Sequence, residues 1–240
     1  MKKGDLKKQE ILRTAETLFC KNGYETTSVQ DILDILNTSK GSFYHHYASK
    51  ELLLEEICRQ RAKAVAESIL SEIDESQSVI HNLNRIISGF MPLSGEKQTF
   101  LMMILPVFDL PEGRQIRFSY AESLADSFRK VTLRELARGH DNGELYCVNP
   151  EHSTDVLFLL LNECWFRICS RILENEKKET DTDPFDLLKI IESYRKTTET
   201  LLFAPYGSII LFKLEDIKFL SEQIHYHWKL HHSNIIKEVS

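Results

Sequence analysis

The chain has 240 residues and a mass of 27.9 kDa, enough for one large domain or a small domain beside a larger one. Hydrophobic residues make up 42% and charged residues 28%, with nine glycines and six prolines, which excludes fibrous and disordered classes and favours helices. No apolar run reaches the roughly 20 residues that span a bilayer, and no signal peptide is readable at the basic start. We therefore expect a cytoplasmic globular protein.

The net charge of −6 is unevenly distributed. Residues 1–61 carry ten Lys or Arg and nine Asp or Glu, whereas the rest of the chain carries twenty and twenty-seven. From Thr38 to Lys50 there are two lysines, two histidines and no carboxylate. A positive strip within an acidic protein is typical of a nucleic-acid contact.

The odd number of cysteines and the lack of a CxxC pair favour buried thiols over disulfides or a metal site. A redox sensor built on Cys164 and Cys169 is the alternative, although a spacing of five would separate the two on a helix. The five are Cys20, Cys58, Cys147, Cys164 and Cys169.

The N-terminal pattern predicts a helix from about Leu6 to Asn22 that ends at the Asn22-Gly23 pair. Its buried face should hold Ile11, Leu12, Ala15, Leu18 and Phe19. Ser28 followed by Asp31 predicts a capping box that opens a second, short helix over Val29–Leu36. Its inward residues should be Ile32, Leu33 and Leu36.

Asn37 tolerates the left-handed conformation and is expected to make a tight turn after this helix. Thr38-Ser39 can then cap another short helix over Lys40–His46, which completes a helix-turn-helix. Ser49 is expected to cap a longer helix that runs toward about Ile73. Its apolar stripe should include Leu53, Ile57 and Ala64.

The segment around this pattern resembles the DNA-binding head of TetR-type regulators over about residues 8–58. Asn37 departs from the glycine that the family often has, but asparagine can take the same backbone conformation. The matching places are Gly23-Tyr24, Thr27-Ser28, Asp31-Ile32, the run Gly41-Ser42-Phe43-Tyr44-His45-His46-Tyr47, and the run Ser49-Lys50-Glu51-Leu52-Leu53.

A short recognition helix must bring its first turn to base edges, and small residues there allow the backbone to approach closely. Lys40 is the long donor at that end, and Tyr44 lies on the same face, while Lys50 adds charge at the start of the next helix. The resemblance implies that Lys40 and Ser42 contact bases. It also implies that Thr27, Ser28 and Lys50 contact phosphates, and that Gln30, Tyr44 and His45 contact either.

The full set of expected DNA-binding residues is Thr27, Ser28, Gln30, Thr38, Ser39, Lys40, Gly41, Ser42, Tyr44, His45 and Lys50. Other interpretations stay open for part of it. Thr27 and Ser28 could only cap a helix, and Gln30 could be solvated. Phe43, His46 and Tyr47 are interpreted as packed in the small core.

Beyond the head, proline and glycine breaks predict about six more helices. The residues Ile209–Phe212 could form a strand by composition, but the periodicity after them favours a final helix. The family resemblance implies an all-helical body that dimerises. The all-round apolar helix Val156–Ile172 and a stripe on the helix Pro184–Phe203 are the expected interface. That stripe is Leu187, Leu188, Ile191, Tyr194 and Leu201.

An internal effector site is a further implication of the family, and an apolar, neutral or cationic ligand would suit an acidic body. The alternative is that the residues concerned are ordinary core. The expected lining is Met102, Met103, Phe108, Phe118, Tyr120, Trp165 and Phe166. No metal or other cofactor is expected: His227 and His231 share a helix face, but nothing nearby completes a tetrahedral site.

No nucleophile elbow, phosphate loop, metalloprotease motif or dinucleotide fingerprint occurs, so we do not expect an enzyme. The sequence predicts an all-α protein with a helix-turn-helix domain over residues 1–50, a linking helix over 51–73 and a regulatory and dimerisation domain over 74–240. Its expected function is that of a ligand-responsive repressor that binds a palindromic operator as a homodimer. The alternative is an architectural or chromosome-organising DNA binder without an effector.

Overall fold

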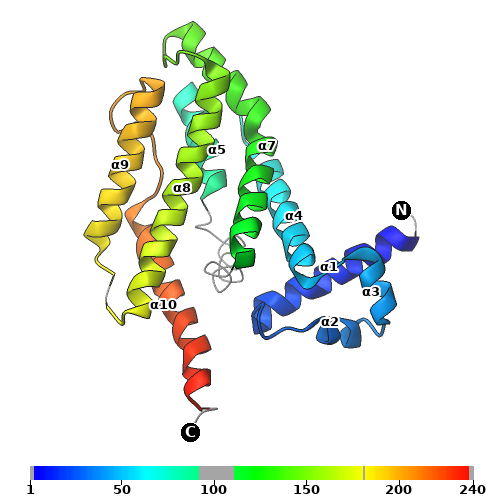
Figure 1. Ribbon diagram of the computed structural model, residues 1–240. Coiled ribbons are helices and arrows are strands. Elements are labelled where there is room, and N and C mark those ends of the chain that lie inside the picture. Colours follow the sequence, from blue (N-terminus) through cyan, green and yellow to red (C-terminus); the bar gives the residue numbers. More distant parts are fainter. Residues whose placement is uncertain (1–2, 92–110, 181, 238–240) are drawn as a thin grey trace. The chain divides into compact units, whose positions relative to one another are not determined.

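The computed structural model describes residues 3–91, 111–180 and 182–237 (Figure 1). Over these ranges the chain forms nine helices and no strand, which confirms the predicted all-α fold. It divides into two compact units. The first comprises the described parts of residues 1–65 and 95–124, and the second comprises those of residues 66–94 and 125–240.

The first unit contains the predicted helix-turn-helix. Its helices are α1 (Lys3–Asn22), α2 (Val29–Ile35), α3 (Lys40–His46) and most of α4 (Lys50–Leu70). The four predicted helices are confirmed, with α3 at the expected bounds and α1 starting earlier than expected. Leu36 is the C-cap of α2 rather than its last residue, and is half-buried.

The apolar faces of α1 to α3 form a small core. The five residues predicted for the buried face of α1 are all at most 8% exposed. Gly23 has a φ of 93°, a left-handed conformation that a side chain would strain, and it ends α1 as predicted. Phe43 is fully buried and Tyr47 is 5% exposed, so both are core residues as expected. Burial raises the pKa of Tyr47 to about 12.

The buried face of α4 differs from the prediction at Ala64, which is exposed. Ala62 and Ala66 are buried instead. The buried residues of α4 follow an i, i+4 row that also includes Leu54 and Cys58. Because a step of four residues drifts around the helix relative to a step of seven, Ala64, seven residues after Ile57, lies off this row. The described start of α7 (Pro111–Asn142) is tied to α4, because the Ser119 hydroxyl donates to Glu55 Oε1 at 2.7 Å.

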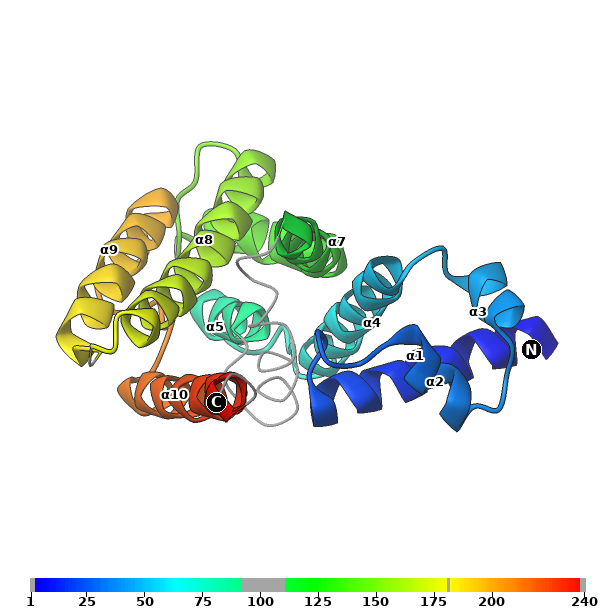
Figure 2. The same cartoon turned by 60° about the horizontal axis from the view of Figure 1, so that its bottom comes forward.

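The second unit contains the remaining helices: α5 (Val79–Phe90), the rest of α7, α8 (Pro150–Lys177), α9 (Pro184–Leu202) and α10 (Leu214–Lys237). Helices α8 and α9 run antiparallel side by side, and α10 contacts both of them (Figures 1 and 2). Helix α5 packs on α8 through Phe90, whose ring stacks on Phe158 with centroids 4.9 Å apart. Gly89 is needed beside it, because an added Cβ would lie 2.5 Å from Phe128 Cζ.

The second unit also buries charge. Glu135 on α7 is fully buried, and its carboxylate accepts hydrogen bonds from Arg138 Nη2 at 2.6 Å, Arg134 Nη2 at 3.2 Å and Asn82 Nδ2 at 3.0 Å. Arg138 also donates to the carbonyl of Gln77 at 3.0 Å. This network joins α7 to α5 and to the loop before α5.

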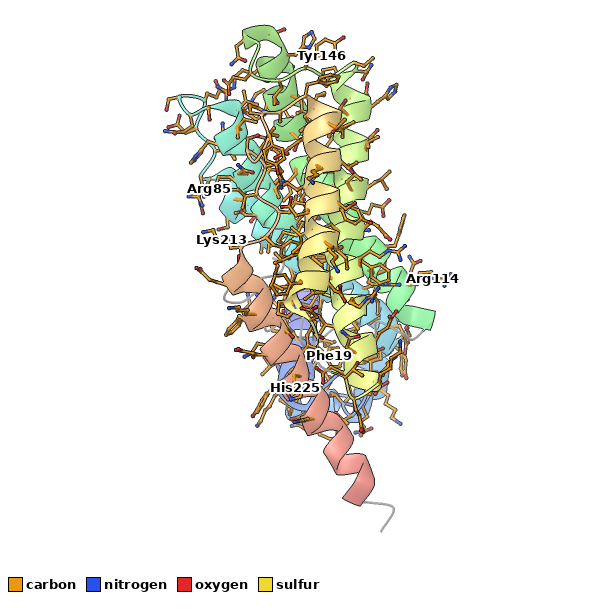
Figure 3. All side chains as sticks on the ribbon, turned by 90° about the vertical axis from the view of Figure 1, so that its left-hand side faces the viewer. Phe19, Arg85, Arg114, Tyr146, Lys213 and His225 are labelled. Atoms are coloured by element: carbon orange, nitrogen blue, oxygen red, sulfur yellow. The ribbon has the colours of Figure 1, made fainter. Side chains whose placement is uncertain are left out.

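A second buried ion pair holds the segment between α9 and α10. Arg195 Nη1 donates to Glu199 Oε2 at 2.7 Å, and Glu199 Oε1 accepts from the backbone N–H of Ile209 at 3.2 Å. From α5, the amide of Asn84 pairs with the backbone of Ser208 and Ile210, donating to the first and accepting from the second at 2.8 Å each. Residues 209–212 form neither strand nor helix, and the backbone N–H groups of Ile209 and Ile210 donate to side chains, Glu199 and Asn84. Figure 3 marks the end of this segment at Lys213.

Candidate nucleic-acid interface

The start of α2 is fixed by the predicted capping box. The Asp31 backbone N–H donates to Ser28 Oγ at 3.2 Å, and the Ser28 N–H donates to Asp31 Oδ2 at 2.7 Å. The Ser28 hydroxyl also donates to that carboxylate at 2.8 Å. These hydrogen bonds from the Ser28 backbone and hydroxyl lower the pKa of Asp31. Ser28 therefore caps α2 while its side chain stays exposed.

The turn between α2 and α3 has the predicted geometry. Asn37 has a φ of 44°, in the left-handed region, and the following N–H of Thr38 donates to the Leu33 carbonyl at 3.1 Å. Ser39 is the N-cap of α3, since its Oγ accepts from the Ser42 N–H at 3.3 Å. The two caps and the turn fix where α2 and α3 begin and how the chain turns between them.

Helix α3 presents one exposed face and one buried face. Lys40, Gly41, Tyr44 and His45 are exposed and follow one another at helical spacing, while Phe43 points into the core. The Tyr44 side chain is 55% exposed, so its hydroxyl is available to a partner. A Cβ added at Gly41 would meet only Ser39 Oγ, at 3.8 Å, so packing within the chain does not require glycine there.

The other expected DNA-binding residues differ in solvent exposure and in their hydrogen bonds within the chain. Thr38 and Ser42 are half-buried and Ser39 is exposed. Gln30 is exposed on α2, and its Nε2 donates to Asp34 Oδ1 at 2.7 Å. A glutamine and an aspartate at i, i+4 on a helix commonly form such a hydrogen bond, so the sequence contains a signal for this pair. His46, expected to pack in the core, is half-buried beside His45.

Two members of the predicted set face inward. Thr27 is 1% exposed, and its hydroxyl donates to the Gly23 carbonyl at 2.8 Å, so this side chain closes the end of α1. Lys50 Nζ donates to the carbonyls of Tyr24 at 2.9 Å and Thr27 at 3.1 Å. Tyr24, which the sequence marked only as part of a motif, is thus a central residue of this region.

The expected effector residues fall into three places. Met102, Met103 and Phe108 lie outside the described residues. Phe118, 61% exposed, and Tyr120, 3% exposed, belong to the first unit. Trp165, 3% exposed, and the half-buried Phe166 belong to the second. Each described pair lies on one helix, and the position of an effector pocket stays a prediction.

Other features bear on alternative functions. The side chains of His227 and His231 lie outside the described residues, and no group of three metal-ligating side chains occurs among those that are described. Four of the five cysteines are buried as predicted, and Cys20 is half-buried. Within the described ranges, no helix combines the length and apolarity required to cross a membrane.

Comparison with known proteins shows which family this helix-turn-helix resembles. The family model for bacterial regulatory proteins of the tetR family matches residues 11–57. The transcriptional repressor KstR2 of Rhodococcus jostii is 43% identical over 141 residues, which cover 57% of this chain and 67% of the repressor. KstR2 of Mycobacterium tuberculosis is 26% identical over 166 residues, or 66% of this chain and 80% of that one. The chain belongs to the TetR family.

Two solved structures share the fold. A family member from Pectobacterium atrosepticum aligns with a TM-score of 0.54 at 18% identity, covering 85% of this chain and all of that one. GusR of Salmonella enterica gives a TM-score of 0.53 at 18% identity, with 85% and 99% coverage. Members of this family are DNA-binding transcription regulators and not enzymes, which confirms both of those predictions.

Proposed function

We propose that this protein represses transcription as a homodimer that binds a palindromic operator with α3 in the major groove. The exposed face of α3 carries this proposal, because it combines Lys40, Gly41, Tyr44 and His45 and contains no carboxylate. A cation and small residues at the first turn suit base edges and a close backbone approach. Bacterial DNA as the target implies action in the cytoplasm.

Different residues would contact the DNA bases and the DNA sugar-phosphate backbone. Lys40 and Ser42 would contact base edges, and Tyr44 and His45 would contact phosphates or bases at the other end of α3. Thr38 and Ser39 would approach the DNA backbone from the turn before α3. Ser28 and Gln30 would approach it from the start of α2. Gly41 would be required by the DNA, since nothing within the chain crowds its Cβ position.

The test begins with selection of the preferred sequence from random duplexes by the full chain, followed by fluorescence anisotropy on cognate and scrambled DNA. Lys40→Ala should narrow the affinity difference between the two duplexes about tenfold, because a direct base contact provides roughly 1–3 kcal/mol of discrimination. Lys218→Ala is the control, since it removes the same charge from an exposed site on α10. Equal affinity of the unmodified chain for all duplexes would contradict an operator-specific function.

The dimer would form through the outer faces of α8 and α9. Leu159 on α8 is 68% exposed and Val156 is 41% exposed, while Tyr194 and Leu201 on α9 are half-buried. Of the predicted stripe, Leu187 and Ile191 are already buried within one chain and are left out of the proposed contact. Two such faces together would make a four-helix contact related by a two-fold axis.

Sedimentation at micromolar concentration tests the dimer. Leu159→Glu should convert it to a monomer, because a charge would be buried at the contact. Val148→Glu is the matched control, since this residue is 88% exposed and lies outside α8 and α9. A monomeric unmodified chain, or equal effects of both variants, would contradict the proposed interface.

The response to a ligand is supported by the family and by the acidic charge of residues 62–240. One protein of the same fold, from Saccharomonospora viridis, was solved in complex with choline; it aligns with a TM-score of 0.51 at 18% identity. A thermal-shift screen of neutral and cationic compounds should find ligands that also release operator DNA. A compound that raises the melting temperature of the protein but does not release operator DNA would bind without regulating, and would contradict a ligand-responsive repressor.

Genome-wide mapping of bound DNA separates this function from an architectural one. A regulator should occupy one or a few palindromes, whereas an architectural protein should occupy many sites without a shared sequence.

A further inference from the structure

The turn between α1 and α2 is held from the start of α4. Lys50 Nζ donates to the Tyr24 carbonyl at 2.9 Å and to the Thr27 carbonyl at 3.1 Å, and these two residues lie three apart in the turn. A lysine ammonium has three donors, so two of them are committed within the chain. Both bonds are charge-assisted, the stronger kind of hydrogen bond.

Tyr24 is held at both of its ends. The ammonium of Lys50 lies 4.1 Å from the centroid of the Tyr24 ring, within the range of a cation–π interaction. The Tyr24 hydroxyl donates to Glu51 Oε1 at 3.3 Å, and the ring meets Phe19 of α1 edge-on with centroids 5.1 Å apart. The first turn of α4 therefore contacts the backbone, ring and hydroxyl of Tyr24, the second residue after α1.

The surroundings of Lys50 do not suit a phosphate. The carboxylates of Glu51 and Glu25 both act on its ammonium electrostatically and favour its charged form, so this cation already has anionic neighbours within the chain. Burial is the main effect on this group, and it lowers the pKa of Lys50. A lysine whose role is to bind a DNA phosphate is expected to be solvated in the free protein, whereas the Lys50 ammonium already donates to two carbonyls.

We propose that Lys50 is a positioning residue for DNA binding: it locks the α1–α2 turn onto α4 and thereby sets the direction of α2 and α3. The carbonyl of Thr27 immediately precedes Ser28, the N-cap of α2, so fixing it fixes the point where α2 begins. Lys50 then contributes to affinity through the shape of the head and not through its charge on the DNA backbone. This inference rests on the proposed function.

The first experiment measures operator affinity over a series of salt concentrations. Lys50→Met should weaken binding about tenfold at every salt concentration, since the loss of hydrogen bonds to a charged group is worth that factor or more. The slope of log affinity against log salt should not change. A slope reduced by about 0.9 would assign Lys50 to a phosphate and overturn the proposal. Unchanged affinity would also overturn it.

Tyr24→Leu removes the ring and the hydroxyl without a change of charge. It should weaken binding as Lys50→Met does, and the double variant should bind little more weakly than either single one, because both break the same lock. Lys50→Arg keeps the charge, the donors and the contact with the ring, and should restore most of the affinity. Losses that multiply in the double variant would show that Lys50 and Tyr24 act independently and would contradict the lock.

The second experiment needs no variant that might fail to fold. Reductive methylation of the unmodified chain, read out by mass spectrometry, should modify Lys50 slowly whether or not operator DNA is present. Lys40, which is exposed, should react fast alone and slowly with DNA. Protection of Lys50 only in the presence of DNA would overturn the lock. Failure of DNA to protect Lys40, or of the unmodified chain to bind DNA, would instead count against the proposed function.

Discussion

The two units bury different kinds of side chain. In the first unit, the buried polar residues among those described are the hydroxyls Thr27 and Ser119. The second unit buries the charged groups Glu135, Arg195 and Glu199. The second unit therefore buries charged groups that pair with residues far away in the chain, such as Glu135 with Asn82, whereas the starts of α2 and α3 are fixed by caps that lie within a few residues of one another.

The largest test of this difference is Glu135→Ala. This change removes the buried carboxylate that pairs with Arg138 and accepts a hydrogen bond from Asn82, which should cost about 3–5 kcal/mol. Urea unfolding followed by circular dichroism would measure it. DNA-head variants such as Lys40→Ala should leave the midpoint unchanged. A loss from Glu135→Ala below that of a single helix cap would mean that the buried network is not what holds the second unit.

Gly89→Ala tests whether packing around the phenylalanine cluster is as strict as the charge network. The new Cβ would lie 2.5 Å from Phe128 Cζ and 2.9 Å from Cε2, so rings must move, at a cost of about 1–3 kcal/mol. Gly41→Ala is the matched control in the head. It should keep or raise stability, since Gly41 is in a helix with open space, but it should weaken operator binding. Equal stability of both variants would contradict this contrast.

Ser28→Ala tests the local rule that builds the head. It removes the acceptor for the Asp31 N–H and one donor to the Asp31 carboxylate, and should cost about 1 kcal/mol. Thermal unfolding of the full chain, with Ser76→Ala as a control in an exposed loop outside the head, would measure it. Operator affinity should fall as well, because α2 would begin less sharply.

Lys189→Ala should have the smallest effect. Its ion pair with Asp186 spans the first turn of α9, and both side chains are exposed, at 77% and 51%. Exposed pairs of this kind contribute little to stability, so the unfolding midpoint should not shift measurably. Together with Glu135→Ala, this variant separates buried from exposed ion pairs in the same unit. A clear loss of stability would contradict this contrast between buried and exposed ion pairs.

The same difference explains what the sequence could predict. The bounds of α3, the capping box at Ser28 and the turn at Asn37 follow from neighbouring residues, and all three are confirmed. The direction of a long side chain depends on its surroundings in three dimensions. That is why Lys50 was expected on DNA although its ammonium lies on two carbonyls of the α1–α2 turn.

Long-range pairing was not predicted for the second unit. The stripe on α9 was expected as one surface, but Leu187 and Ile191 are buried while Tyr194 and Leu201 are only partly covered. Helical periodicity gives the apolar side of a helix, but it does not say which part of that side a neighbouring helix covers. The burial of Glu135 and Glu199 could not be predicted either, because both look like surface carboxylates in a charged helix.

The amide of Asn84 has a consequence for how this protein can change in length. In a β-ladder, one inserted residue shifts the register and moves every later side chain to the opposite face. Here only the backbone of Ser208 and Ile210 is held by the amide, and the buried Ile209 and Leu211 lie beside them. Between Leu202 and Ser208, the Tyr206 ring packs against Arg195, whose Cζ lies 4.7 Å from the ring centroid. We therefore expect a short insertion that keeps Tyr206 in place to be tolerated, because the Asn84 contact is made to residues beyond it.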